Sequence, residues 1–468
     1  MKRIVGPMPE IRKKRPSPLT RLIQGRHSSL DVLFERSYSM KMGEFSGIRR
    51  KFYFLTQPDI VNRILSADVD LYPKSDLMGT ILYQILGNGV FVSNGETWKR
   101  QRRMMNPAFD FARISEVFPL MMQAAEDMKA RLDEMADGRE VAIDFEMTHV
   151  TADIIFRTIF SEPIPREDAA TIFDAFNNYQ ELAYIHGVWN MAGLPQALSI
   201  PRLRAIRHAR NIRGPLARMV RKRFEQLEKD PESAPKDILT SLIAARDTDG
   251  SKFTEKELVD QIAVMFLAGH ETSASALSWA LYLIARDSDV QERMHKETEL
   301  AFGGEDGLSP RKFKFLKLTR DVFRETLRLY PPVSFVPRDI TVPETIRDKH
   351  LKKGSAIFIS LWLMHRHRET WKNPDVFDPD RFSREEEKEA IRSAYIPFSQ
   401  GPRVCLGASF ALQEAAIILS MIARHYEISP VEGHVPRPVA RLTLRSENGI
   451  RLRLRKREPG APGEQAAI

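Results

Sequence analysis

The stretch FSQGPRVCLG, Phe398 to Gly407, contains Cys405, the only cysteine among 468 residues. Gly401 and Gly407 permit a tight turn and a close approach of the backbone to a flat, bulky group. Arg403 places a fixed positive charge two residues from the sulfur, which suits an anionic group. An apolar helical segment follows, and the N–H groups of its first turn should lower the pKa of the thiol. A lone cysteine is usually inert packing, but these neighbours indicate a thiolate that binds a metal.

The same stretch resembles the haem-binding signature of the cytochrome P-450 family, with matches at Phe398, Gly401, Arg403, Cys405 and Gly407. The resemblance implies haem b (iron protoporphyrin IX) as the cofactor, with Cys405 as the axial thiolate ligand of its iron. It also implies a mainly α-helical fold, in which a large helical domain carries small peripheral β-sheets and a long central helix. A soluble, bacterial-type member of the family is expected.

Helical periodicity dominates the rest of the chain. A long helix is predicted over residues 254–286, because Thr254 and Glu257 form a capping box before a mostly apolar segment. Short strands are predicted at 51–55 and 355–360. Residues 442–457 alternate apolar and basic side chains around an Asn-Gly turn signal, which predicts a β-hairpin.

The stretch AGHETS, residues 268–273, lies in the middle of the long predicted helix. A glycine and two hydroxyl residues are poor helix formers, so one interpretation is a helix that tolerates a kink. The resemblance instead implies the family's oxygen-binding groove, with Ala268 and Gly269 beside the haem and space at the glycine for dioxygen. Glu271 and Thr272 then supply an acid and an alcohol for proton delivery.

Three arginines match the family's contacts to the two haem propionates. Trp98 and Arg102 are four residues apart and therefore share one helical face. They match the WxxxR motif of the helix that meets the propionates, and Arg338 matches a further propionate arginine. The three arginines, Arg102, Arg338 and Arg403, would form charge-assisted hydrogen bonds to the propionate carboxylates. The alternative, a solvated basic residue, applies most to Arg338.

A second charged constellation matches the family's structural ion network. Glu325 and Arg328 lie three apart on a predicted helix, and Arg381 matches the third member. Surface salt bridges contribute little to stability. The sequence order and the haem signature instead favour a buried triad that holds the fold without taking part in the chemistry.

No linker or internal repeat divides the chain. We expect a basic, disordered N-terminal arm over residues 1–19, one domain over 20–456 and a flexible tail over 457–468. A single cysteine excludes an intramolecular disulfide. No apolar run reaches the length of a membrane span, and the N-terminus lacks the apolar core of a signal peptide. These features predict a cytoplasmic protein.

The net charge is 71 − 62 = +9. Most basic residues alternate with acidic ones, so the charge does not favour nucleic-acid binding. Residues 218 and 221–223 form a basic run that is most simply a solvated helix face. The chain ends soon after the predicted hairpin, which leaves no room for a fused reductase. We therefore expect a separate acidic electron donor, a ferredoxin or flavodoxin with its reductase.

The resemblance implies a monooxygenase that inserts one atom of dioxygen into a C–H bond of a lipophilic small molecule. Apolar residues are candidates for the substrate pocket, together with the turn at 442–444. They are Leu77, Met78, Ile81, Leu82, Val90, Phe91, Phe266, Val333, Phe335 and Val336. Among lipophilic substrates, we expect fatty acids or other alkyl chains. The alternatives are a terpenoid or aromatic hydroxylase, a peroxide-driven peroxygenase and a non-catalytic haem-thiolate sensor.

Overall fold

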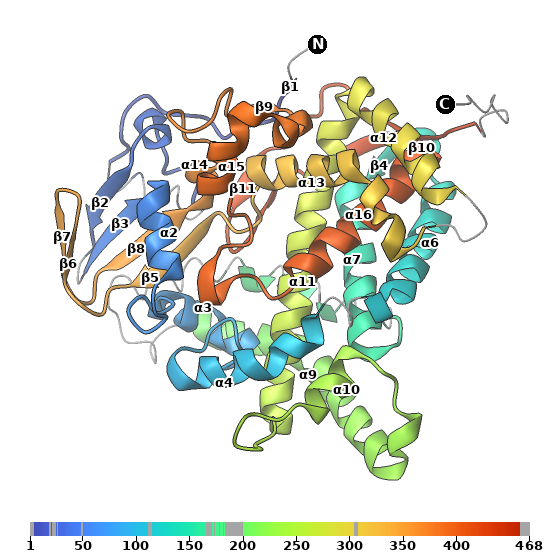
Figure 1. Cartoon of the computed structure of the whole chain (residues 1–468), viewed down its shortest axis with the longest axis horizontal. Helices are drawn as coiled ribbons and strands as arrows, with labels where there is room; N and C mark the ends of the chain where they lie inside the picture. The colour runs from blue at the N-terminus through green and yellow to red at the C-terminus, as the bar shows by residue number, and fades with distance from the viewer. Residues whose placement is uncertain are drawn as a thin grey trace.

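The predicted long helix forms the centre of the molecule as α11 (Glu255–Ala285), which has 31 residues. Its capping box is confirmed: the Glu257 N–H donates to Thr254 Oγ1 over 3.2 Å, and the Thr254 N–H donates to Glu257 Oε2 over 2.9 Å. Figure 1 shows α11 running down the middle of the computed structural model, beside α7 (Ile143–Phe160) and α16 (Ala408–His425). Most α11 side chains are buried because helices pack on nearly every side of it.

The structure describes residues 4–458 apart from 18–19, 21–24, 26, 48–49, 111–114, 165–170, 173, 177, 181, 183–199 and 304–307. The helices α9 (Ile200–Lys229) and α13 (Lys317–Leu329) also pack against α11. Further helices are α2 (Pro58–Ser66), α3 (Asp76–Leu86), α4 (Gly95–Met105), α6 (Phe118–Asp133), α10 (Ile238–Ala244), α12 (Ser288–Phe302), α14 (Leu361–Met364) and α15 (Lys388–Ala394). Among the described helices, none is both long and apolar enough to cross a bilayer.

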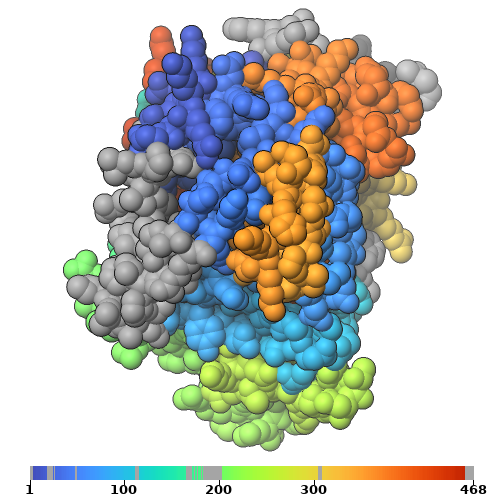
Figure 2. All heavy atoms as spheres, turned by 90° about the vertical axis from the view of Figure 1, so that its left-hand side faces the viewer, coloured from blue at the N-terminus to red at the C-terminus, as the bar shows by residue number. Residues whose placement is uncertain are grey.

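A four-stranded sheet lies at one side of the helical body. Its order is β2 (Met42–Ser46), β3 (Lys51–Leu55), β8 (Ala356–Ser360) and β5 (Phe335–Asp339), with β3 and β8 parallel. Both predicted strands are therefore confirmed, and they bring segments about 300 residues apart into one sheet. Figure 2 faces this side, where the blue N-terminal segments lie next to the orange segment that includes the β6–β7 hairpin (Glu344–Ile346 and Lys349–Leu351).

The predicted hairpin at 442–457 is wrong. Its first strand, β12 (Leu444–Ser446), pairs with β11 (Pro438–Ala440). Its second strand, β13 (Arg451–Lys456), pairs instead with β10 (Tyr426–Pro430) and β4 (Asp137–Ala142). Gly449 does take the left-handed conformation of a turn residue, with φ of 73°. The turn therefore connects two different sheets, because more distant strands supply the pairing partners.

Part of the expected N-terminal arm packs on the domain. Strand β1 (Ile4–Val5) pairs with β9 (Val376–Phe377), and Ile4 is buried. The Tyr330 hydroxyl donates to the Pro7 carbonyl over 2.8 Å. The division into arm, domain and tail stays a prediction, and the tail beyond residue 458 lies outside the described residues.

The predicted ion triad is confirmed as a buried network. Arg328 donates two hydrogen bonds of 2.8 Å to the Glu325 carboxylate, and both side chains are fully buried. Arg381 Nε donates to the same carboxylate over 3.2 Å, and its Nη1 forms a 2.9 Å ion pair with Glu387. The Arg328 guanidinium also donates to the carbonyls of His365, Pro374 and Val376. This network ties α13 to the segment that leads into the Cys405 loop.

Candidate functional site

The Cys405 loop is anchored on one side and open on the other. The Cys405 N–H donates to the Phe398 carbonyl over 2.9 Å, which closes the loop. Gly401 has φ of 70°, and a Cβ there would lie 2.2 Å from the Leu65 carbonyl oxygen at the end of α2, so only glycine fits. A Cβ at Gly407 would meet nothing within 4 Å. The loop therefore packs tightly against α2 and faces open space next to the sulfur.

The Cys405 side chain is exposed to solvent, but the surrounding protein groups still desolvate its sulfur. Burial raises the pKa of the thiol, and the Gly407 N–H and the Arg102 charge oppose this to a smaller extent. The expectation of a lowered pKa is therefore wrong for the thiol by itself, because desolvation outweighs the helix N-terminus. In the described part of the chain, no group of three or more His, Cys, Asp and Glu side chains could hold a metal ion. A metal bound at Cys405 would need to bring its other ligands with it, as a porphyrin does.

Cationic side chains gather around the loop from three elements. Arg102 of α4 donates to the Val404 carbonyl over 2.8 Å. The Arg403 guanidinium lies 4.7 Å from the centroid of the buried Trp98 ring and donates to Asn94 Oδ1 over 2.9 Å. Arg338 of β5 is buried and donates to the Pro337 carbonyl. The structure thus brings together the four residues that the sequence assigned to the propionates.

A fourth cation, Lys74, was not predicted. Its Nζ donates to the carbonyls of Val90 and Ser93 over 2.6 and 2.9 Å. Its backbone forms an antiparallel bridge with Arg338, and its N–H donates to Asn94 Oδ1. No sequence motif marks Lys74 or Asn94, and their position follows only from this long-range bridge.

We call Lys74, Arg102, Arg338 and Arg403 the cation cluster. Within the described residues, none of them forms an ion pair with a carboxylate; their bonds go to carbonyl and amide oxygens. Burial, with repulsion from Arg403, lowers the pKa of Arg338 to about 10, and burial lowers that of Arg403 to about 10. Burial and repulsion from the three arginines hold the pKa of Lys74 well below its usual range. A group that carries carboxylates, such as the two propionates of a haem, would fit this cluster of cations.

In the middle of α11, the buried stretch of the helix gives way to exposed and half-buried residues. Ala268 is exposed although the seven residues before it, from Gln261 to Leu267, are buried. The Thr272 hydroxyl donates to the Ala268 carbonyl over 2.6 Å. A Cβ at Gly269 would come within 2.9 Å of the Ile155 side chain, so this glycine allows α11 and α7 to approach closely. Space at Gly269 for dioxygen stays a prediction, and close helix packing is an independent reason for the glycine.

Glu271 is held by groups outside α11. The Thr443 hydroxyl donates to Glu271 Oε1 over 2.9 Å, and the Gln180 amide lies 3.4 Å from the same oxygen. His270 is buried, with Nδ1 2.8 Å from the Phe266 carbonyl oxygen and its ring against Phe266. The Glu271 carboxylate is therefore fixed by a loop hydroxyl, while the neighbouring histidine belongs to the core.

A further buried carboxyl joins the two sides of the site. Glu414 lies on α16, nine residues after Cys405, and forms a hydrogen bond with Ser273, which follows Thr272 on α11. Burial raises the pKa of Glu414 to about 8, and Ser273 opposes this less strongly. This carboxyl is therefore neutral at pH 7. Its hydrogen bond links α16, the helix that follows the Cys405 loop, to α11. Sequence reasoning missed it, because a glutamate in an amphipathic helix gives no signal of burial.

The predicted substrate-pocket residues differ in burial. Met78, Ile81, Val90, Val333, Phe335 and Val336 are half-buried, and Phe91 is exposed. Leu77 and Leu82 are buried. Phe266 is fully buried and packs edge-on against Phe156, so it belongs to the core between α11 and α7.

The comparisons with known proteins give one consistent answer. The sequence profile of the cytochrome P-450 family matches residues 20–453. The chain is 30% identical over 398 residues to cyclooctatin synthase of Streptomyces melanosporofaciens, covering 84% of each chain. It is 26% identical to taurochenodeoxycholic 6 alpha-hydroxylase of Sus scrofa, covering 87% of this chain and 82% of the relative. The crystal structure of the cytochrome P450DA heme domain superposes with a TM-score of 0.80 at 22% identity, covering 98% of this chain and 99% of that one.

Proposed function

The chain belongs to the cytochrome P-450 family of haem-containing monooxygenases, and on that premise we propose that it hydroxylates the alkyl chain of a lipophilic acid, such as a medium- or long-chain fatty acid. The observation that carries the haem assignment is the cation cluster without carboxylate partners beside the only thiol in the sequence. Half-buried apolar side chains on α3 and β5 support a lipophilic substrate. The relative from Sus scrofa is named a hydroxylase.

The proposed cofactor is haem b with Cys405 as its thiolate ligand. When bound, haem would supply the redox chemistry that activates dioxygen for the hydroxylation. The cation cluster would hold the propionates, with Trp98 supporting Arg403 through the face of its ring. Other residues would shape the faces of the site. On the thiolate side these are Phe398, Gly401 and Gly407, and on the oxygen side they are Ala268 and Gly269.

We assign proton delivery to Thr272 and Glu271. The Thr272 hydroxyl donates to a carbonyl of its own helix, so its oxygen can accept a hydrogen bond from water. After rotating, the hydroxyl can pass on its proton as it receives another from that water. The Thr443 hydroxyl keeps the Glu271 carboxylate in one orientation. Both residues lie in the half-buried middle of α11, where water can reach them.

Electrons would come from a separate acidic protein, a ferredoxin or flavodoxin with its reductase, in the cytoplasm. The net charge of +9 supports attraction to such a donor. With a surrogate acidic ferredoxin, the second-order rate of haem reduction should fall as salt rises from low to physiological concentration. A rate that does not respond to salt would contradict electrostatic docking.

The substrate proposal is tested by optical titration of the purified protein. The titrants are fatty acids of increasing length, the matched alcohols, terpenoids and aromatic compounds. We expect fatty acids to convert the haem from low to high spin, because an apolar chain displaces water from the oxygen side. A shift given only by terpenoids or aromatics, or by no compound, would contradict the substrate class while leaving the haem assignment in place.

A further inference from the structure

The helix α9 divides into two halves that differ in how their cations are paired. Residues 200–224 contain eight arginines and one lysine but no acidic residue. In the C-terminal part, Arg221 pairs with Glu255 and Lys222 with Glu162. Arg223 is buried and binds Asp237, so the expectation of a solvated face is wrong for this residue. The preceding turns of α9 face a pocket instead.

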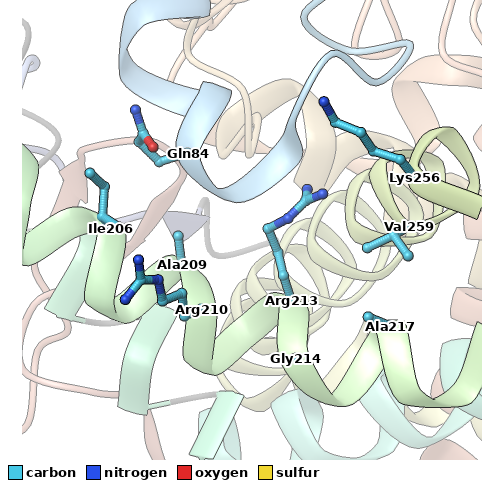
Figure 3. A pocket seen from close by; sticks show the side chains of 9 residues that line it. All are labelled: Gln84, Ile206, Ala209, Arg210, Arg213, Gly214, Ala217, Lys256 and Val259. Carbon is cyan, nitrogen blue, oxygen red and sulfur yellow. The ribbon is translucent and has the colours of Figure 1, made fainter.

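This pocket has a volume of about 470 Å³ and lies between α9, α3 and α11. Figure 3 shows its two walls, with α9 on one side and with Gln84 of α3 and Lys256 of α11 on the other. Its apolar lining includes Ile206, Ala209 and Val259. Leu203, one turn before Ile206, is 69% exposed and extends the apolar stripe of α9 beyond the pocket.

Three cations line the pocket, and none of the described carboxylates does. Arg213 is fixed by an ion pair with Asp260 and by a 3.2 Å hydrogen bond to the Ile85 carbonyl. Arg210 and Lys256 are exposed and form no ion pair among the described residues. The acidic residues on either side of Lys256 are already engaged, because Glu255 binds Arg221 and Glu257 binds Arg100. Two positive charges therefore remain without partners beside an apolar surface.

Gly214 opens the floor of this pocket. It lies in the interior of a 30-residue helix, where glycine lowers helix stability relative to alanine. A Cβ built at Gly214 would meet only the flexible end of Arg218, at 3.9 Å. Pro215 follows within the helix, and a proline disfavours the helical conformation of a preceding residue that carries a side chain, so the glycine also relieves this backbone clash. With no side chain at Gly214, the floor of the pocket stays open.

We propose that this pocket is a second binding site, separate from the catalytic cavity, for an alkyl carboxylate. The carboxylate lies between Arg210 and Lys256, and the first methylene groups lie along Ile206, Ala209 and Val259. The cations would form charge-assisted hydrogen bonds to the carboxylate, while the apolar wall excludes water from the chain. The site does not depend on haem or on the catalytic substrate. The same chemistry is offered by a free fatty acid and by anionic lipid in a bilayer, and we choose the free acid because the two cations and the apolar side chains line one and the same pocket.

The experiment is a calorimetric titration of the full-length holoprotein with dodecanoate below its micellar concentration. A parallel optical titration reports the catalytic cavity. We expect binding in addition to any that changes the spin state of the haem. The double variant Arg210→Gln/Lys256→Gln should weaken this additional binding at least about tenfold. Arg207→Gln, which removes an exposed cation of α9 outside the pocket, should have no effect.

Several outcomes would overturn the proposal. It is wrong if the double variant binds dodecanoate like the parent, or if Arg207→Gln weakens binding as much as the double variant. It is also wrong if dodecanol binds as tightly as dodecanoate at this site. Co-sedimentation with phosphatidylglycerol vesicles but not phosphatidylcholine vesicles, without binding of free dodecanoate, would assign α9 to a membrane surface instead. If no fatty acid changes the spin state but the additional binding persists, the proposed substrate is wrong and this site stands.

Discussion

Two groups of buried or half-buried arginines in this molecule have opposite electrostatic surroundings. Burial by itself lowers the pKa of Arg381, but Glu325 and Glu387 together raise it above its usual value. In the described part of the chain, neither Arg338 nor Arg403 forms an ion pair with a carboxylate, and their pKa values fall to about 10. The first group is a closed network that stabilises the fold. The second has no carboxylate partner among the described residues, and we propose that the haem propionates bind there.

Breaking the closed network should have the largest effect. Glu325→Gln leaves Arg328 and Arg381 buried without their shared carboxylate, so the free energy of unfolding should fall by about 3–5 kcal/mol. Chemical denaturation measures this. The matched control is Glu389→Gln, which breaks an exposed ion pair with Arg392 and should cost less than about 0.5 kcal/mol. Equal destabilisation by both variants would contradict the central role of the buried network.

Glu414 provides a third case, a buried carboxyl with no cation, which avoids the cost of its charge by staying protonated. Its pKa is about 8 in the folded protein and ordinary in the unfolded chain. Its contribution to stability is therefore complete below the unfolded pKa and is lost as the pH rises through about 8. The loss should be on the order of a few kcal/mol. Glu414→Gln should be more stable than the parent at pH 8.5 and should show a smaller decrease in unfolding free energy between pH 5 and pH 8.5. Parallel pH dependences would contradict a neutral carboxyl.

Removing a cation from the cation cluster should affect the cofactor more than the fold. Arg338→Met keeps most of the side-chain volume and removes an unpaired buried charge, so the haem-free protein should be as stable as the parent or more so. Haem should leave the variant about tenfold faster, because one charge-assisted contact to a propionate is lost. Transfer to an excess of a haem-scavenging protein measures this rate. Lys352→Met, an exposed cation far from the loop in sequence, is the control. A haem-free variant that is strongly destabilised would show that Arg338 belongs to a closed network after all.

Thr272 should show the smallest effect on stability and affinity. Thr272→Ala removes a hydroxyl whose only described bond is to its own helix, so unfolding should change by less than about 1 kcal/mol. The fraction of consumed oxygen that appears as product should fall several-fold, because proton delivery loses its alcohol. Thr272→Ser should restore it. Undiminished coupling in Thr272→Ala, measured as product formed per oxygen consumed, would contradict the assigned role.

The parts of the structure that depend on local sequence were predictable. The Thr254 capping box, the strands at 51–55 and 355–360 and the Glu325–Arg328 pair are each specified by a few neighbouring residues. The Cys405 loop was found because its residues are contiguous. These features follow from short-range rules of capping, alternation and spacing.

The parts that depend on long-range contacts were missed or wrong. The Asn448-Gly449 turn was identified, but its strands pair with segments that no local rule specifies. Lys74 joins the cation cluster only through its backbone bridge to Arg338. The pKa of Cys405 is raised rather than lowered because desolvation depends on the whole surrounding fold.

The central claim is that Cys405 binds the haem iron through its thiolate and that the cation cluster binds the haem propionates. The most direct measurement is the absorption spectrum of the reduced, carbon-monoxide-bound protein, for the parent, for Cys405→His and for Arg338→Met. We expect the thiolate band in the parent, the same band at lower haem occupancy in Arg338→Met, and haem without the band in Cys405→His. A parent protein that binds haem without the thiolate band, or Arg338→Met with unchanged occupancy and unchanged haem loss, would contradict the account.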